Sequence, residues 1–438
     1  MALTNGFPQV VQPNVVPLVV DHVALPDQSP HYIQAVADLG EEREIVAHED
    51  IYASNGMKLL AKGARINRQQ AERLKMHKLQ VPLDLVLSAE QTIDGSMLAA
   101  DANRMFAEDP VMLRLAERSG DPQGFRQGLS ALTLSRPLGF RLTVMREKRN
   151  GLYRHTLRVA LITHAMAVRL DLTEMEKHDV LLAALCHDLG EMHTDPELLA
   201  SDHRITSEQR RFIHVHPITS YVILQAMPDI PSATLQAVLH HHERIDGSGY
   251  PHGLTESEIH PLAKLLCVAE VMVGVVRRAD RHRLDVILRL NQQRFDPAVL
   301  GVLRDLLRIG DSEKQAALPE CDPSVHLTHV MAVIAAWPGV RDALAAQPSC
   351  GPSLGFLNER MSLLRSLVLQ VGIDPENAEM LLELARGERE ILIELHATLD
   401  ELHWMMIDIA NEAERRTALL DPLTRSIVFK LITVLRLG

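Results

Sequence analysis

Residues 240–251 combine three consecutive histidines with a glycine-rich turn. They read His-His-His-Glu-Arg-Ile-Asp-Gly-Ser-Gly-Tyr-Pro and follow an apolar run with helical spacing. Successive helical side chains point about 100° apart, so one metal ion would not easily take all three imidazoles. Two neighbours could still face one cavity and serve different ions, while Gly247 and Gly249 let the backbone turn closely around them. The alternative is a helix C-terminus that the histidines favour electrostatically and the glycines only cap.

Other side chains that commonly ligate metals flank this stretch, and 13 of the 22 histidines lie between His155 and His260. The apolar spacing predicts five helices that converge on one place and turn polar residues inward. The mixture of imidazoles and carboxylates suits iron, manganese, zinc or nickel, whereas calcium and magnesium prefer oxygen ligands only. The predicted ligands are His155, His187, Asp188, His216, His241, His242 and Glu270.

Seven ligands exceed the needs of one ion, which predicts a centre of two divalent transition-metal ions with Asp188 as the bridge. Iron or manganese is the first expectation, and zinc or nickel the second. A lone His155 on an apolar helix would more often be an ordinary core histidine than a ligand. Burying all seven without partners, however, would cost several kcal/mol each. The remaining histidines of this region, such as His164, are interpreted as surface residues or as residues beside the ligands.

Composition limits the class of protein. Aromatic residues make up only 3% of the 438 residues, which favours a mostly α protein. A formal net charge of −12 argues against binding long nucleic acids, although a metal centre can still attract a small anion. The four cysteines contain no Cys-x-x-Cys pair, and no apolar run approaches the roughly 20 residues needed to cross a bilayer. We therefore expect a cytoplasmic protein without membrane insertion.

Proline, glycine and apolar spacing divide the chain into four predicted segments. Residues 1–40 are interrupted by prolines and are expected to be an extended lead-in. Residues 41–141 are expected to form a small α+β module with linker helices, and residues 142–310 the metal domain. Residues 311–438 are predicted to form a helical region, where apolar residues from Leu381 to Ile409 follow an interrupted heptad. A homodimer through that long helix and packing within the chain both fit this pattern.

Two stretches resemble the signatures of the HD-GYP family, a branch of the HD-domain metal-dependent phosphohydrolases. They are His-Asp-Leu-Gly at 187–190, and His-His-Glu-Arg at 241–244 running into Asp-Gly-Ser-Gly-Tyr-Pro at 246–251. The residues around His155, the solitary His216 and Phe-Asp-Pro at 295–297 are also similar to family positions. The resemblance covers about residues 142–310 and implies an HD-type helical bundle. It also implies hydrolysis of the second messenger cyclic di-GMP at a centre of two or three metals.

The chain departs from the family pattern at several positions. Glu191 replaces the lysine that usually follows the His-Asp motif and is thought to hold a substrate phosphate. Glu270 stands where the family usually has aspartate, and the Arg-Pro-Tyr that commonly follows is absent. Gly151 lacks the carboxylate found in members with three metals, so the resemblance implies two.

These departures leave two main hypotheses for the function. The first is a phosphodiesterase in signalling, in which Asp188 and Glu191 act in catalysis and Arg244, Gly249, Tyr250 and Lys264 contact the substrate. The second is a catalytically weakened or inactive module that binds the nucleotide or a signalling protein as a sensor or scaffold. A mixed-valent di-iron oxidoreductase is a third, because the wider HD superfamily includes such chemistry.

Glu191 is predicted to point toward the mouth of the cavity, where it could act in two opposite ways. Its carboxylate would repel an incoming phosphodiester of the same sign, so Glu191→Lys would then improve binding and turnover. Alternatively it could ligate a metal or accept a proton from water, and Glu191→Lys would then reduce metal content or activity. The sequence favours the first role, because seven ligands already suffice.

Overall fold

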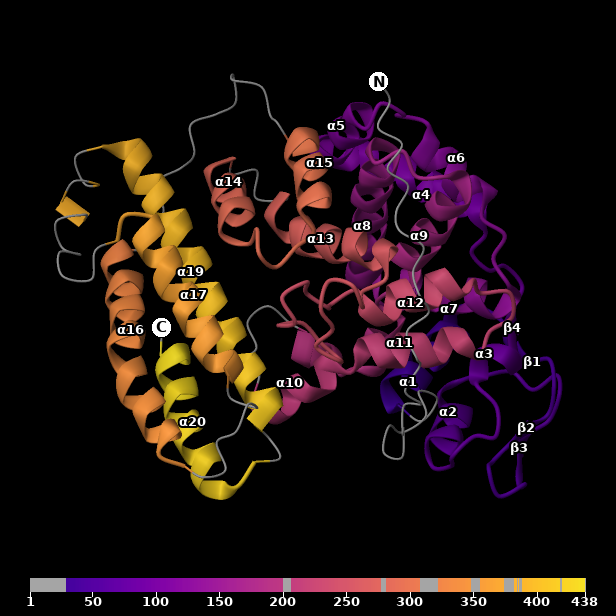
Figure 1. Cartoon of the computed structure of the whole chain (residues 1–438). Coiled ribbons are helices and arrows are strands. Elements are labelled where there is room, and N and C mark those ends of the chain that lie inside the picture. The colour runs from indigo at the N-terminus through magenta and orange to yellow at the C-terminus, as the bar shows by residue number, and fades with distance from the viewer. Residues whose placement is uncertain are drawn as a thin grey trace. The chain divides into compact units, whose positions relative to one another are not determined.

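The computed structural model describes residues 29–199, 206–276, 281–307, 322–347, 355–373, 382–383, 385, 388–417 and 420–437. Helices dominate these residues, and the strands among them are short and confined to the N-terminal region, which confirms the predicted fold class. The described residues divide into two compact units (Figure 1). The first holds the residues up to 276 together with 295–307, and the second holds 281–294 together with those from 322 onward.

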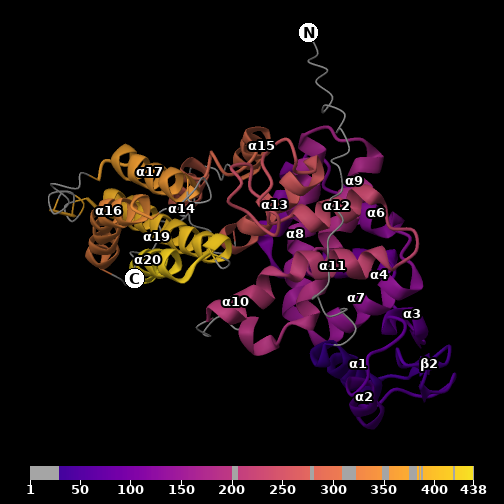
Figure 2. The same ribbon diagram turned by 60° about the horizontal axis from the view of Figure 1, so that its bottom comes forward.

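The N-terminal module combines short strands and helices, as predicted. Strand β1 pairs antiparallel with β4, and β2 with β3, so the module contains two small ladders. The Asn67 side chain accepts from the Gln70 amide and caps α2, which ends at Lys75. Figure 2 shows α1, α2 and β2 together at one end of this unit. The bounds are α1 (Pro30–Glu42), β1 (Ile45–Ala47), β2 (Ile51–Tyr52), β3 (Lys58–Leu60), α2 (Arg68–Lys75), α3 (Leu83–Val86) and β4 (Leu87–Ala89).

Helix α1 corrects the expectation of an extended lead-in over residues 1–40. The helix begins at Pro30, where the missing proline amide is tolerated in the first turn, and the Ser29 side chain caps it by accepting from the His31 amide. Its buried residues include Tyr32, Ile33 and Val36. The part of that expectation covering residues 1–28 lies outside the described residues.

The remaining elements of the first unit surround the predicted metal ligands. Helices α8, α9, α12 and α13 pack against one another, and α11 packs on both α12 and the short helix η2. Capping boxes of Thr173 with Glu176 and of Thr206 with Gln209 begin α9 and α10. The bounds are α4 (Gly95–Glu108), α5 (Pro110–Arg118), α6 (Gly124–Ala131), α7 (Arg136–Lys148), α8 (Asn150–Arg169), α9 (Glu174–Cys186), η2 (Leu189–His193), η3 (Pro196–Leu199), α10 (Ser207–His214), α11 (His216–Gln225), α12 (Ser232–His240), α13 (Pro261–Val276) and α15 (Pro297–Leu307).

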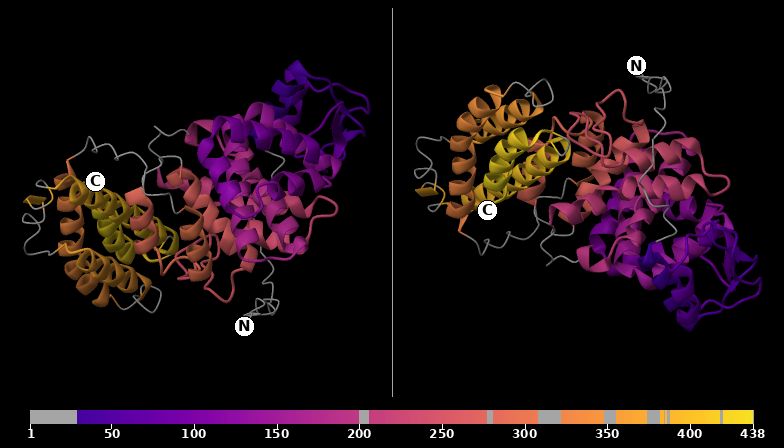
Figure 3. Two further views of the ribbon diagram at one scale, coloured as in Figure 1. Left: turned by 90° about the horizontal axis from the view of Figure 1, so that it is seen from above. Right: turned by 90° about the horizontal axis from the view of Figure 1, so that it is seen from below.

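The second unit is a helical bundle, in which α19 packs against α14, α16, α17 and α20 (Figure 3). Helix α14 belongs to this bundle, although it lies within the residue range predicted for the metal domain, whose boundaries stay a prediction. None of the helices that the structure describes is long and apolar enough to cross a membrane. The bounds are α14 (Arg281–Leu290), α16 (Pro323–Ala345), α17 (Gly355–Gln370), α19 (Arg389–Thr417) and α20 (Pro422–Arg436).

The predicted heptad of the C-terminal region packs within the chain. Leu395, Leu402, Met405 and Ile409 are buried in the core of the second unit, where neighbouring helices of the same bundle cover them. Ile391 is 40% exposed and does not continue the seam, and Leu381 lies outside the described residues. These four residues therefore have partners within the chain, and a homodimer through this helix stays a prediction.

We predict that Leu402→Ala lowers the free energy of unfolding of the second unit by about 2–5 kcal/mol, because the side chain is fully buried. Ile391→Ala, on the exposed face of the same helix, should cost less than about 1 kcal/mol. Urea denaturation of the full-length variants would measure both values. Equal effects of the two substitutions would contradict this packing of α19.

His164 of α8 is buried, which excludes the first of the two positions expected for it, at the surface or beside the ligands. Its ring lies 5.7 Å from that of Phe125, and neither ring nitrogen has a hydrogen-bond partner among the residues that the structure describes. Burial lowers the pKa of His164 from 6.5 to about 4. The folded state therefore binds this proton less tightly than the unfolded state, and stability is lost as the pH falls from about 6.5 to about 4.

The free energy of unfolding should fall by about 3 kcal/mol between pH 6.5 and pH 4 because of His164. We predict that His164→Leu removes this part of the acid sensitivity, because leucine carries no titrating group. Denaturant titrations at pH 7 and pH 4.5 would compare the variant with the native protein. If the free energy of unfolding differed between pH 7 and pH 4.5 by the same amount in the variant and the native protein, His164 would not cause the acid sensitivity.

Candidate metal centre

The structure brings the seven predicted ligands together in the first unit. His155, His187, Asp188 and Glu270 offer ligand atoms that all lie within 4.8 Å of one another. His216, His241 and His242 form a second such group. The side chains of His155 and Glu270 are 29% and 19% exposed, whereas His187, His216 and His241 are almost fully buried. The cluster is therefore more accessible on the side of α8 and α13.

Asp188 lies between the two groups and directs one carboxylate oxygen to each. Its Oδ2 atom is 3.1 Å from His187 Nε2 and 3.7 Å from His155 Nε2. Its Oδ1 atom is 3.3 Å from His216 Nε2 and 3.9 Å from His241 Nε2. A carboxylate in this position can bridge two ions.

The backbone fixes the orientation of three of these histidines in the same way. His187 Nδ1 contacts the Ala184 carbonyl at 2.8 Å, His216 Nδ1 the Ile213 carbonyl at 2.7 Å, and His241 Nδ1 the Val238 carbonyl at 2.6 Å. A carbonyl only accepts, so in neutral imidazoles these contacts place the proton on Nδ1 and leave the Nε2 lone pair free. Histidine ligands in metal sites are commonly oriented by such a hydrogen bond.

The Nε2 atoms of His216 and His241 face each other, and this arrangement indicates whether the site suits a cation. His216 Nε2 and His241 Nε2 are 3.1 Å apart, and both Nδ1 atoms already contact carbonyls. Two unprotonated Nε2 atoms at this distance direct their lone pairs at each other, which is unfavourable unless a positive charge lies nearby. The donor set of imidazoles and carboxylates therefore fits a divalent transition metal.

Burial also keeps the second group of histidines neutral. It lowers the pKa of His241 to about 3, with His187 and His216 adding to the effect, and it lowers the pKa of His242 well below 6.5. Burial opposes ionisation at Asp188, but neighbouring His187 lowers the pKa of this carboxyl to about 2. At neutral pH the second group thus offers unprotonated imidazoles beside an ionised Asp188, as metal binding requires. In the first group burial opposes protonation, but the Glu270 carboxylate raises the pKa of His155 and the Asp188 carboxylate raises that of His187, so a metal ion would displace these protons.

Gly190 allows the His-Asp turn to approach the start of α11. A Cβ atom at this position would collide with the His216 backbone. The Gly190 amide donates to Ser220 Oγ at 2.8 Å, and that hydroxyl donates to the His187 carbonyl at 2.6 Å. Ser220 thereby holds the turn that carries His187 and Asp188 against α11. Sequence reasoning missed this role, since a lone serine in an apolar helix gives no signal of its own.

Glu243 organises the loop that follows the three histidines. This buried carboxylate accepts from the amides of His252 and Leu254 at 2.7 and 2.9 Å. A Cβ atom at Gly249 would collide with the backbone of Glu243 and Arg244, so only glycine fits the close return of the chain. Glu243 was another residue that the sequence interpretation missed, although it adjoins the ligand pair.

Tyr250 follows Gly249 and lies against two histidines. Its ring stacks on His242 with the centroids 4.6 Å apart, and it lies 4.4 Å from the ring of His214. Tyr250 therefore packs beside one of the ligands and helps to fix its ring.

The three consecutive histidines join the ligand groups in a different way from the sequence expectation. His241 and His242 fall in one group with His216, rather than being shared between two ions. His240 is directed elsewhere, since its Nδ1 atom accepts from the His260 amide at 3.3 Å. Helix α12 ends at His240, and His241 caps it with backbone angles still in the right-handed helical region.

Two of the predicted substrate contacts have other partners. The Arg244 guanidinium donates to Cys267 Sγ and lies 4.8 Å over the ring of Phe295. The Lys264 ammonium pairs with Asp296 at 3.2 Å and its side chain is 14% exposed. Among the described residues, no hydrogen bond or ion pair joins either cation to a predicted ligand, so the structure holds both cations on other partners.

Glu191, predicted at the mouth of the cavity, is half-buried and lies with the ligands. Its carboxylate joins Asp188 and His216 in a third group whose ligand atoms lie within 4.8 Å of one another. Burial raises the pKa of Glu191 well above 4.5, and the nearby carboxylates of Asp188 and Glu270 add to the effect. This position favours the metal-ligand role over repulsion of the substrate.

Comparison with known proteins agrees with the motifs. Residues 143–299 match the HD domain family. The middle of the chain is an HD domain. This result confirms the resemblance to the HD-domain phosphohydrolases at the level of the domain.

Several curated relatives share this part of the chain. Over 155 residues it is 31% identical to the cyclic di-GMP phosphodiesterase PA4108 of Pseudomonas aeruginosa, covering 34% of this chain and 37% of that protein. Over 171 residues it is 27% identical to the 3′3′-cGAMP-specific phosphodiesterase 1 of Vibrio cholerae, covering 34% and 39%. A cyclic di-GMP phosphodiesterase of Thermotoga maritima is 31% identical over 127 residues, covering 29% and 34%. The chain thus spans little more than a third of the length of these relatives.

Proposed function

We propose that this protein hydrolyses cyclic di-GMP at a centre of two divalent transition-metal ions in its HD domain. The observation that carries the proposal is the position of Asp188, whose two oxygens face separate groups of histidines. The names of the relatives support a cyclic dinucleotide as the substrate class. Iron or manganese suits the ligand set best, with zinc or nickel as alternatives.

In this proposal the two groups of side chains hold one ion each. His155, His187 and Glu270 would hold the first, and His216, His241 and His242 the second, with Asp188 between them. Such ions, when bound, supply Lewis-acid stabilisation of a phosphoryl group and make water a better nucleophile near neutral pH. The carbonyls that fix Nδ1 of His187, His216 and His241 keep the ligands in place without further reorganisation.

The protein's own residues would also define how the substrate approaches. The exposed edges of His155 and Glu270 mark the accessible side, where a phosphodiester could reach the cluster. Tyr250 and the Gly249 turn would form part of the wall beside His242. Glu191 could serve as a further ligand or hold a proton from the attacking water, because its carboxylate lies beside Asp188 and His216.

A nucleotide-binding or protein-binding module without turnover is the second candidate. The observation in its favour is that the cations considered for the substrate phosphates, Arg244 and Lys264, are engaged with Cys267 and Asp296. Glu191 adds to this, since it replaces the lysine of the family pattern. Such a module would bind the nucleotide but release no product.

The deciding experiment incubates the full-length protein, purified without oxygen, with cyclic di-GMP and with 3′3′-cGAMP in the presence of Mn²⁺ or Fe²⁺. Chromatography would detect linear dinucleotide or mononucleotide, and metal analysis of the same preparation should approach two ions per chain. Turnover of 3′3′-cGAMP alone would keep the hydrolase but change the substrate. Binding without product would favour the sensor, and a stoichiometry of one or less after reconstitution would contradict the dinuclear centre.

A further inference from the structure

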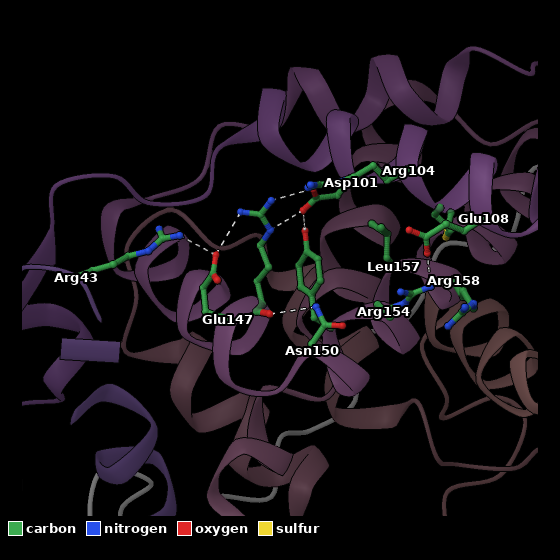
Figure 4. A pocket seen from close by; sticks show the side chains of 12 residues that line it. Arg43, Asp101, Arg104, Glu108, Glu147, Asn150, Arg154, Leu157 and Arg158 are labelled. Atoms are coloured by element: carbon green, nitrogen blue, oxygen red, sulfur yellow. Dashed lines mark hydrogen bonds and ion pairs between the residues drawn. The ribbon is translucent and has the colours of Figure 1, made fainter. Parts of the chain in front are cut away.

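A cavity of about 470 Å³ lies in the first unit, and none of the proposed metal ligands lines it. Its walls come from α4, α7 and α8 and from Arg43 at the end of α1. Sites for small ligands commonly have volumes of about 300–1,000 Å³, so the cavity is large enough for a nucleotide-sized molecule. Figure 4 shows the side chains that line it.

The charge of this cavity is opposite to that of the whole chain. Five arginines and three carboxylates line it, while the chain has a net charge of −12. The arginines are Arg43, Arg104, Arg146, Arg154 and Arg158, and the carboxylates are Asp101, Glu108 and Glu147. A concave positive surface on an acidic protein attracts small anions and disfavours most other ligands.

Shared carboxylates hold the guanidinium groups in place. Asp101 accepts from the Tyr153 hydroxyl at 2.7 Å and from Arg146, and it also pairs with Arg104. Glu147 pairs with Arg43 at 3.0 Å and with Arg146 at 3.6 Å. Glu108 pairs with Arg154, and Asp109 pairs with Arg158 at 3.3 Å. Five guanidinium groups thus share four carboxylates, so they are oriented but only partly neutralised. Guanidinium groups fixed in this way are suited to bidentate binding of phosphate.

The arginines occupy both ends of the cavity. In Figure 4, Arg43 lies at one end beside Glu147, and Arg154 and Arg158 lie at the other beside Glu108. Arg104 lies between them next to Asp101. The side chains of Arg104 and Arg154 are 62% and 45% exposed, so they can turn toward a ligand without disturbing the core. Two separated anionic groups would match this arrangement.

We infer that the cavity is a binding site for a small ligand with two phosphate groups, such as a nucleoside bisphosphate, separate from the metal centre. Tyr153 is buried and donates to Asp101, which leaves its ring unable to stack on a base. Recognition would therefore depend on the phosphates and little on the identity of the base. The ligand would lie along α8, where Arg154 directly precedes the proposed metal ligand His155.

Isothermal titration calorimetry of the full-length protein with adenosine 3′,5′-bisphosphate tests this site, with adenosine as the uncharged reference. The double variant Arg104→Ala, Arg154→Ala should bind at least about tenfold more weakly, because it loses two charge-assisted contacts. Arg65→Ala is the matched control, since Arg65 is an exposed arginine paired with Glu44 outside the cavity. The dissociation constant of Arg65→Ala for the bisphosphate should equal that of the native protein.

A variant that should bind the bisphosphate more tightly gives an independent check. Glu108→Gln removes the carboxylate that pairs with Arg154, so the bisphosphate should bind several-fold more tightly. Repeating the titration with Asp188→Asn separates this site from the metal centre, because binding in the cavity should persist in that variant. Absence of binding to the native protein, or equal affinity of the native protein and the double arginine variant, would overturn the inference.

Discussion

Asp188→Asn is expected to empty the metal centre and to lower the rate of cyclic di-GMP hydrolysis by about a thousandfold or more. Asparagine keeps the size of the side chain but has no negative charge, and only one of its two terminal atoms can accept. The native carboxylate lies within 3.3 Å of both His187 and His216, so its loss affects both groups of ligands. Single histidine variants should keep more metal, because each belongs to one group.

Metal content after reconstitution, measured by plasma mass spectrometry, and product formation would test this expectation together. Asp179→Asn is the matched control, since Asp179 is a buried aspartate of α9 that contacts His178 outside the cluster. It should keep both metals and its activity. If Asp188→Asn kept two ions per chain, Asp188 would not be the bridge.

Glu191→Lys is expected to lower metal content and to reduce hydrolysis by about a hundredfold. The native carboxylate lies with Asp188 and His216, so a lysine ammonium would take a position beside the proposed cations. Two like charges about 4 Å apart repel by about 4 kcal/mol at an effective dielectric constant of 20, which is enough for an effect of this size. The expectation that lysine restores a substrate contact is therefore replaced, because Glu191 lies with the ligands rather than at the mouth alone.

Glu191→Gln separates the charge of this residue from its size, and it should reduce metal affinity less than Glu191→Lys does. Glu197→Lys reverses an exposed acidic residue in the neighbouring η3 helix and should leave metal content unchanged. Both readouts, metal content and product formation, would be taken on the same preparations. Undiminished metal with faster hydrolysis in Glu191→Lys would show that the native glutamate opposes the substrate.

The sequence by itself determined the fold class and the candidate ligands of this protein. The capping boxes at Thr173 and Thr206 depend on residues three positions apart, so local sequence alone specifies where α9 and α10 begin. The ligand set could be proposed because His187, Asp188 and the histidine run stand in motifs with a recognisable spacing. Helical periodicity then indicated that these motifs turn inward.

Only the tertiary structure decided how those side chains meet. The seven candidates come from segments up to 115 residues apart, as in the pair of His155 and Glu270, and no local pattern fixes such a distance. The inward position of Glu191 and the engagement of Arg244 with Cys267 depend on contacts between helices. The C-terminal heptad illustrates the same limit, because apolar spacing predicts a buried face but does not say which helix covers it.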